Sequence, residues 1–202
     1  MSNFDAQAQF FDSIKVQFTH KPSLDVRLES RNSFITSSFA KISAVKVGLD
    51  YNRRVQVGLS SNWLFSDITR PTTIDVEGIP TSTNVRLQYQ YVAPYFEYTF
   101  YRKSGWEFNI PVMIGIGRSH YFTDIGGQRY KTDASWVVSY EPFMVGQYHL
   151  LRYFAVGLGV GYRLILVGHA GLNESFNSPV YILKGRVILG QIWTDIKKVA
   201  KK

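Results

Sequence analysis

Cysteine is absent from this chain of 202 residues, which excludes a disulfide framework, a thiolate metal site and a cysteine nucleophile. Charged residues are also few, at 19% of the chain. No run reaches the roughly 18 consecutive apolar residues that a transmembrane helix needs. The best candidate is FAVGLGVGYRLILVG at 154–168, whose four glycines and Arg163 make it a poor helix. The sequence therefore predicts no transmembrane helix.

The N-terminal segment lacks the basic stretch and the apolar run of a secretory signal. Residues 5–9, DAQAQ, nevertheless carry the A-x-A spacing of signal cleavage sites. Two interpretations stay open. The chain is a cytosolic protein with a chance match, or an exported protein whose start lies just inside its signal. On the second interpretation, residues 1–21 are the remnant of a signal and cleavage region.

What the chain has in abundance is aromatic residues, at 15%, interleaved with small and polar ones. In 154–168 every second residue from Phe154 to Leu166 is large and apolar, and the residues between are Ala155, Gly157, Gly159, Gly161, Arg163 and Ile165. Alternation with a period of two is typical of β-strands. Eight segments show this pattern: 24–29, 44–51, 54–65, 85–91, 106–119, 136–150, 154–166 and 181–190. The sequence predicts an all-β fold of about eight strands.

One segment changes phase. Before Val92 the apolar residues occupy odd positions (Val85, Leu87, Tyr89 and Tyr91, opposed by Arg86, Gln88 and Gln90), and after it they occupy Phe96, Tyr98 and Phe100. Pro94 lies at the change, and a proline inside a sheet belongs at an edge or a bulge. We expect a bulge at Pro94 that restores the register. Two short strands meeting at a corner are the alternative.

The connections between the strands alternate in length. Tight polar turns at 51–54, 102–105 and 149–152 take turns with long segments at 66–84, 123–135 and 168–178 that are rich in Gly, Pro, Thr, Asn and Asp. Long loops that alternate with short ones all emerge at one end of a meander. Transmembrane β-barrels show this arrangement, with short periplasmic turns and longer extracellular loops.

Strand length and aromatic position agree with that arrangement. Several segments exceed the roughly 9–11 residues with which a tilted strand crosses a bilayer. Aromatic residues gather near the strand ends, as in the interfacial girdles of outer-membrane barrels. The predicted girdle residues are Trp63, Phe65, Phe100, Trp106, Trp136, Tyr148, Phe154 and Trp193.

The polar face of the predicted strands carries both signs of charge. Its acids are Asp25, Glu29, Asp50, Glu97, Glu107 and Glu141, and its bases are Arg27, Arg31, Lys46, Arg54, Arg163, Lys184 and Arg186. A narrow eight-stranded barrel has an interior that packed side chains just fill. We therefore expect a closed antiparallel up-and-down transmembrane barrel with its large residues toward lipid and a plugging network of charges in its lumen.

A soluble lipocalin-like barrel, with the apolar face inward around a ligand, is the competing interpretation. It would place the glycine run 157–161 on the outside and overfill a small cavity with aromatic rings. This interpretation fits the pattern less well.

Four stretches also resemble the small outer-membrane β-barrel family of Gram-negative bacteria, similar in architecture to OmpX and the barrel of OmpA. They are PSLDVRLESRNSFI, VKVGLDYNRRVQVGLSSNWL, APYFEYTFYRKSGWEFNIPVMIGIG and YEPFMVGQYHLLRYFAVGLGVGYRLILV. The likeness implies a barrel over 22–193 in the outer membrane, with both termini in the periplasm. The chain departs from the family in lacking a signal peptide and in continuing past Trp193 into a basic tail, 194–202.

Catalytic signals are weak. His20, His120, His149 and His169 are scattered, so we expect no metal site and no cofactor. A rim-site enzyme acting on lipid would have to draw on Ser119, His120, Asp124, His169 or Glu174. Proximity in sequence does not make a triad, because a triad is recognised by geometry. We expect no enzyme.

The net charge of +8 raises the question of a nucleic-acid partner. Four lysines of the excess lie in the tail, and the remaining bases face the predicted lumen, so no nucleic acid is expected. The predicted role is a structural or interaction component of the cell envelope. Its partners would be outer-membrane lipid and other envelope proteins, reached through 66–84, 123–135, 168–178 or the tail. A rim-site enzyme and a small pore remain alternatives.

Overall fold

The computed structural model describes residues 12–35, 38–76, 79–125, 127–131, 134–168, 177–187, 192 and 196. These residues include ten β-strands and a short helix at 12–18. The strands are β1 (Ser23–Ile35), β2 (Ser38–Tyr51), β3 (Val55–Leu64), β4 (Thr69–Val76), β5 (Ile79–Lys103), β6 (Trp106–Ile125), β7 (Gln128–Lys131), β8 (Ser135–Leu151), β9 (Phe154–Val167) and β10 (Ser178–Val187).

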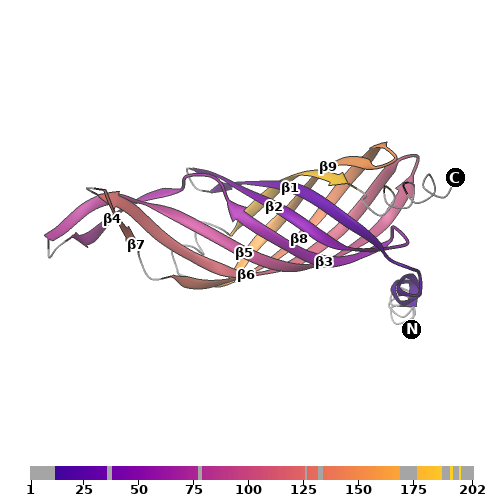
Figure 1. Ribbon diagram of the computed structural model, residues 1–202, viewed down its shortest axis with the longest axis horizontal. Coiled ribbons are helices and arrows are strands. Elements are labelled where there is room, and N and C mark those ends of the chain that lie inside the picture. The colour runs from indigo at the N-terminus through magenta and orange to yellow at the C-terminus, as the bar shows by residue number, and fades with distance from the viewer. Residues whose placement is uncertain are drawn as a thin grey trace, which may run out of the picture.

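Eight of these strands form a closed antiparallel barrel (Figure 1). The hydrogen-bonded order runs β5-β3-β2-β1-β10-β9-β8-β6, and β6 pairs again with β5. The strands β4 and β7 lie outside the ring. The eight strands of the ring pair in the order in which they occur in the chain, and the pairing of β1 with β10 closes the ring. The predicted eight-stranded up-and-down barrel is confirmed.

Three short turns mark one end of the barrel, which we call the turn end. At the β2–β3 turn, Asn52 and Arg53 have φ of 53° and 56°, and at the β5–β6 turn Ser104 and Gly105 have φ of 52° and 85°. Two consecutive residues with positive φ define the type I′ hairpin turn, whose twist matches that of the flanking strands. The third turn joins β8 to β9. Helix 12–18 lies at this end too, where the Phe18 ring meets the Tyr51 ring edge-on at 4.9 Å.

The opposite end continues beyond the barrel, and we call this projection the extension (Figure 1). There β4 pairs with the beginning of β5, from Thr69 opposite Arg86 to Val76 opposite Ile79. In the same way β7 pairs with the end of β6, from Ile125 opposite Gln128 to Phe122 opposite Lys131. The segments 66–84 and 123–135, expected as long loops, are therefore largely strand hairpins. Most of the third long segment, 168–178, lies outside the described residues.

The expected bulge at Pro94 is absent. Pro94 lies opposite Leu59 in an unbroken register between β3 and β5. The register between β5 and β6 shifts instead between Thr99 and Tyr101, close to the turn end. Pro94 is tolerated because its side chain faces outward, and the β5–β6 ladder has no pairing at Ala93 and Pro94.

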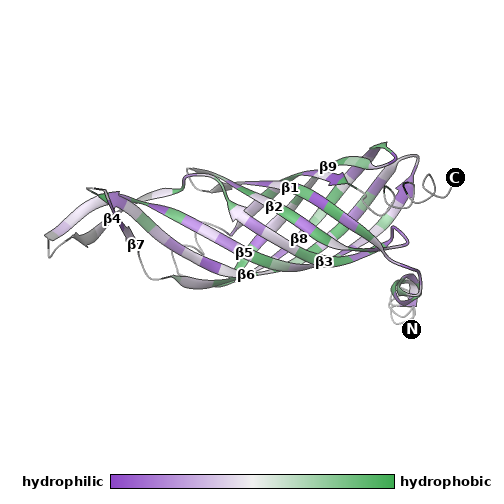
Figure 2. Cartoon of the chain, viewed as in Figure 1, coloured by the Kyte–Doolittle hydropathy of each residue, from purple (hydrophilic) through white to green (hydrophobic). Residues whose placement is uncertain are grey.

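The barrel wall is apolar on its outer side. Figure 2 shows the green, hydrophobic residues alternating with purple and pale ones along its strands. Leu28, Leu59, Leu158, Leu166 and Leu183 are each more than half exposed. The residues next to Leu28, Leu59 and Leu158 on their strands point into the barrel and are small or charged. This apolar band spans the ring strands, whereas the extension is paler and more hydrophilic (Figure 2).

The first half of β5 reverses the predicted orientation. Val85, Leu87, Tyr89 and Tyr91 are at most 3% exposed, whereas Arg86, Gln88 and Gln90 face outward. The prediction that large residues here contact lipid was wrong. This part of β5 lies toward the extension, where an outward polar residue meets no apolar band. The reversal accounts for the phase change at Pro94 without any change of register.

Among the described residues, no helix is both long and apolar enough to cross a membrane.

Candidate functional site

The interior of the barrel holds the buried charge of the described chain. All twelve charged residues that the structure buries are at most 4% exposed and point inward from seven of the eight ring strands. The six carboxylates are those of Asp25, Glu29, Asp50, Glu97, Glu107 and Glu141, and the six bases are Arg27, Arg31, Lys46, Arg163, Lys184 and Arg186. The charges balance, as burial requires.

Arg186 organises the layer nearest the turn end. Its Nε lies 2.9 Å from Asp25 Oδ1, its Nη1 lies 3.4 Å from Glu107 Oε2, and its Nη2 pairs with Asp50. Gln56 donates a hydrogen bond of 3.0 Å to the same Asp50 carboxylate. One guanidinium thus contacts carboxylates from β1, β2 and β6, which ties three strands together across the lumen.

Glu107 also closes the mouth at the turn end. His149 Nε2 approaches its carboxylate to 3.0 Å, and Gln147 Nε2 donates to it at 2.6 Å. Arg53 in the β2–β3 turn and Arg102 near the end of β5 lie 3.8 Å and 3.9 Å away. His149, which begins the turn expected at 149–152, is therefore part of this closure.

Glu97 anchors the middle layer. Arg27 Nη1 lies 2.5 Å and Lys184 Nζ 3.0 Å from its carboxylate, which is fully buried. Glu29 alongside accepts from Lys46 at 2.9 Å and lies 3.4 Å from Arg31 Nε. The two Glu97 pairs reach from β5 to β1 and β10 and so cross the barrel, whereas Glu29 pairs with neighbouring β2 and with its own strand β1.

Glu141 holds the layer toward the extension. Its carboxylate faces Arg31 at 2.9 Å and Arg163 at 3.0 Å, and it accepts a hydrogen bond from Tyr91 Oη at 2.9 Å and from Ser139 Oγ at 3.1 Å. Glu141 is thus the partner of Arg163, the one charged residue in the glycine-rich strand β9.

Arg54 lies outside this network, contrary to expectation. It occupies the β2–β3 turn, is partly exposed, and donates hydrogen bonds to the backbone carbonyls of Thr99 (3.2 Å) and Phe100 (3.5 Å). Alternation failed here because the strand has not yet begun at residue 54.

Two further residues belong to the network. Arg31 Nη2 donates a hydrogen bond to Asn62 Oδ1 at 2.7 Å, and Arg31 Nη1 donates one to Tyr91 Oη at 2.9 Å. In the sequence, only the alternation along β3 indicated that Asn62 faces the interior, and no feature indicated that Tyr91 does.

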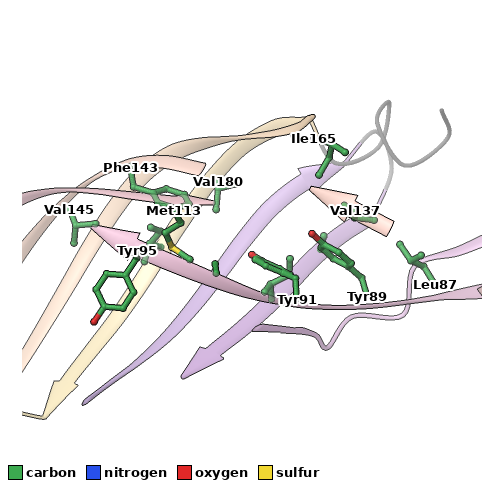
Figure 3. Close-up of a cluster of buried hydrophobic side chains, with 14 residues drawn as sticks. Leu87, Tyr89, Tyr91, Tyr95, Met113, Val137, Phe143, Val145, Ile165 and Val180 are labelled. Atoms are coloured by element: carbon green, nitrogen blue, oxygen red, sulfur yellow. The ribbon is translucent and has the colours of Figure 1, made fainter. Parts of the chain in front are cut away.

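An apolar cluster fills the interior nearer the extension (Figure 3). Leu87, Tyr89, Tyr91 and Tyr95 follow one another along β5 and cluster with residues of β2, β6, β8, β9 and β10. These partners are Ala40, Ile42, Met113, Val137, Phe143, Val145, Ile165, Val180 and Ile182. The lumen is therefore filled in part by large apolar side chains, in addition to the network of charges that was expected.

The predicted girdle residues lie at both ends of the apolar band. Phe100, Trp106, Tyr148 and Phe154 are between 38% and 48% exposed at the turn end, where the Trp106 and Tyr148 rings lie 5.0 Å apart. Trp63, Phe65 and Trp136 lie toward the extension, with Phe65 at 68% and Trp136 at 58% exposed. Trp193 lies outside the described residues.

The candidate rim residues do not converge. Ser119 is buried and faces the interior, whereas His120 next to it on β6 faces outward. Asp124 pairs with Arg129 at 3.1 Å. His169 and Glu174 lie outside the described residues. Within the described part of the chain, no group of three or more His, Asp or Glu side chains could hold a metal ion.

Comparison with known proteins places this geometry in a known architecture. No protein-family model and no curated protein matches the sequence. The crystal structure of Neisserial surface protein A matches 83% of this chain and 96% of its own, with a TM-score of 0.54 and 12% sequence identity. The N-terminal β-barrel domain of Pseudomonas aeruginosa OprF matches 83% of this chain and 98% of its own, with a TM-score of 0.50 and 9% identity. The chain has the fold of the small eight-stranded outer-membrane barrels of Gram-negative bacteria.

Proposed function

We propose that the chain is an integral protein of a Gram-negative outer membrane, with a closed lumen and a structural or interaction role in the envelope. One observation carries the proposal. The outer wall exposes a continuous apolar band, while the interior holds six carboxylates and six bases in mutual contact. In water the band would favour aggregation. In a bilayer it matches the lipid-facing surface of a transmembrane barrel.

The closed lumen follows from the number of strands and the bulk of the side chains. An eight-stranded barrel leaves an interior that side chains just fill. Arg27, Arg31 and Arg186 each reach through that interior to carboxylates on other strands. Tyr91 and Phe143, which belong to the apolar cluster, fill more of the same space. Steady passage of ions would require several buried pairs to separate at once.

The orientation follows from loop length. Outer-membrane barrels have short turns toward the periplasm and longer loops outside. The turn end would therefore face the periplasm, together with both termini, and the extension formed by β4, β7 and the adjoining parts of β5 and β6 would project from the cell. The extension, the segment 168–178 and the tail 194–202 are the surfaces through which envelope proteins would be bound.

Refolding and conductance test the proposal together. The full chain, refolded in detergent and run unheated on a gel, should migrate differently from the heated chain, as a closed barrel does. Inserted in a planar bilayer, it should give no steady conductance. A monodisperse species formed without detergent would contradict the membrane location, and a steady open channel would contradict the closed lumen and favour the alternative of a small pore.

A further inference from the structure

A strip of basic side chains runs up the outer face where the barrel passes into the extension. Arg118 on β6 lies opposite Gln90 and Trp136, and two residues on, His120 lies opposite Gln88. The next outward residue, Phe122, lies opposite both Arg86 and Lys131. Directly opposed residues of antiparallel strands share a face of the sheet. Arg118, His120, Arg86 and Lys131 therefore all point outward, and we call them the basic strip.

The basic strip begins where the apolar band ends. Ile114 and Ile116 precede Arg118 on the same face of β6 and are 47% and 49% exposed. Trp136 beside Arg118 is 58% exposed, and tryptophan is the side chain typical of the membrane–water interface. Arg118 thus lies at the level of the lipid headgroups, and the remainder of the strip lies just above it.

Two cations of the strip have no carboxylate partner in the described part of the chain. The Arg118 guanidinium lies over the Trp136 ring at 4.5 Å, and neither it nor Lys131 forms an ion pair there. Arg86 and the nearby Arg129 pair with Asp67 at 3.2 Å and Asp124 at 3.1 Å. Arg86 and Arg129 also lie over the Phe122 ring, at 5.8 Å and 5.0 Å.

This arrangement leaves two positive charges of the strip unpaired among the described residues, and the Trp136 ring holds one of them, Arg118, in position. Burial and the neighbouring Lys131 ammonium lower the pKa of His120, so the charge of the strip comes from its arginine and lysine side chains. A guanidinium stacked on an indole keeps its N–H edge free, and that edge matches the oxygens of a phosphate.

We propose that the basic strip binds the phosphate groups of an anionic lipid in the outer leaflet, with Arg118 and Lys131 as the main donors. The lipid's acyl chains would lie against the apolar band beneath Arg118. A ligand that carries phosphate and acyl chains together fits this surface, because the free cations and the exposed isoleucines are continuous on one face of β6. The proposal rests on the membrane location proposed above.

Binding of labelled lipopolysaccharide to the full chain, refolded in non-ionic detergent, tests the proposal by fluorescence anisotropy. The test variant is Arg118→Gln with Lys131→Gln. The control is Lys103→Gln with Arg152→Gln, which removes two exposed basic residues at the turn end, including one that lies over an aromatic ring, Tyr153, at 5.9 Å. A heat-dependent gel shift shows that each variant is folded, so a loss of binding is separated from a failure of the barrel to form.

The test variant should bind lipopolysaccharide about tenfold more weakly, since each basic residue near an anionic lipid surface contributes to binding. The control should bind like the wild type. The wild type should bind dephosphorylated lipopolysaccharide more weakly by the same factor, whereas the test variant should bind the phosphorylated and dephosphorylated forms equally. Equal binding of both variants would overturn the proposal. Inorganic phosphate or heparin competing fully in place of the lipid would also overturn it, because the strip would then bind soluble anions and not a lipid.

Discussion

The Phe143 ring on β8 lies in the space that a side chain at Gly161 on β9 would occupy. A Cβ built on Gly161 would come within 2.0 Å of Phe143 Cδ1 and within 2.4 Å of the Pro142 carbonyl oxygen. Tyr95 is placed similarly over Gly48 and Gly58, and its nearest atoms lie 2.3 Å and 2.9 Å from the missing Cβ positions. The inward glycines therefore admit aromatic rings from other strands, and the rings fill the lumen.

Gly161→Ala should destabilise the barrel by about 1–3 kcal/mol, because the added methyl overpacks a site bounded by a ring and by backbone. Urea unfolding of the chain refolded in lipid vesicles measures this loss. Gly185→Ala on the neighbouring strand is the matched control, since its Cβ would meet nothing closer than 3.9 Å. That variant should be neutral or slightly stabilising. Equal effects of the two changes would contradict the packing described for Phe143.

Glu97→Gln should cost about 3–5 kcal/mol, because it leaves Arg27 and Lys184 buried with too little negative charge. The free energy of unfolding in vesicles again gives the measurement. Asp67→Asn breaks the ion pair with Arg86, in which both side chains are at least half exposed, and should cost less than about 1 kcal/mol. A small effect of Glu97→Gln would mean that water reaches the middle layer.

Leu158→Arg tests the assignment of the apolar band to lipid. Leu158 is 69% exposed on β9, and an arginine in the middle of a bilayer-facing wall should cost about 2–4 kcal/mol of folding free energy in vesicles. Gln88→Arg places the same charge on the outward face above the band and should change stability little. If Leu158→Arg proved neutral, the wall would be facing water.

Ser104→Asn should stabilise the β5–β6 turn by about 0.5–1 kcal/mol. Ser104 has φ of 52°, which costs energy for most side chains, and the change creates the Asn-Gly pair that type I′ turns favour. Ser104→Val is the contrasting variant. It should destabilise by about 1 kcal/mol or more, because a β-branched residue tolerates positive φ poorly. Stability that ranked the two variants in the opposite order would argue against this turn geometry.

Alternation located the strands and most of the buried charges because a period of two assigns each side chain to a face wherever both faces have constant surroundings. It failed on β5, whose outer face leaves the apolar band near Gln90. Beyond that point large residues fill the interior and polar ones face outward. It also failed at Arg54, where a turn residue was interpreted as part of a strand. The segments 66–84 and 123–135 show no alternation that would have predicted the strands β4 and β7 within them.

The sequence by itself determined that this chain is an antiparallel barrel with one apolar face and a balanced set of inward charges, because these follow from residue order along each strand. Only the tertiary structure decided which carboxylate meets which base. Arg163 could have paired with Glu97, Glu107 or Glu141, and the register of β8 against β9 brings it to Glu141. Pairs that cross the lumen, such as Arg31 with Glu141, depend in addition on the stagger and closure of the whole ring, and no local pattern records either of them.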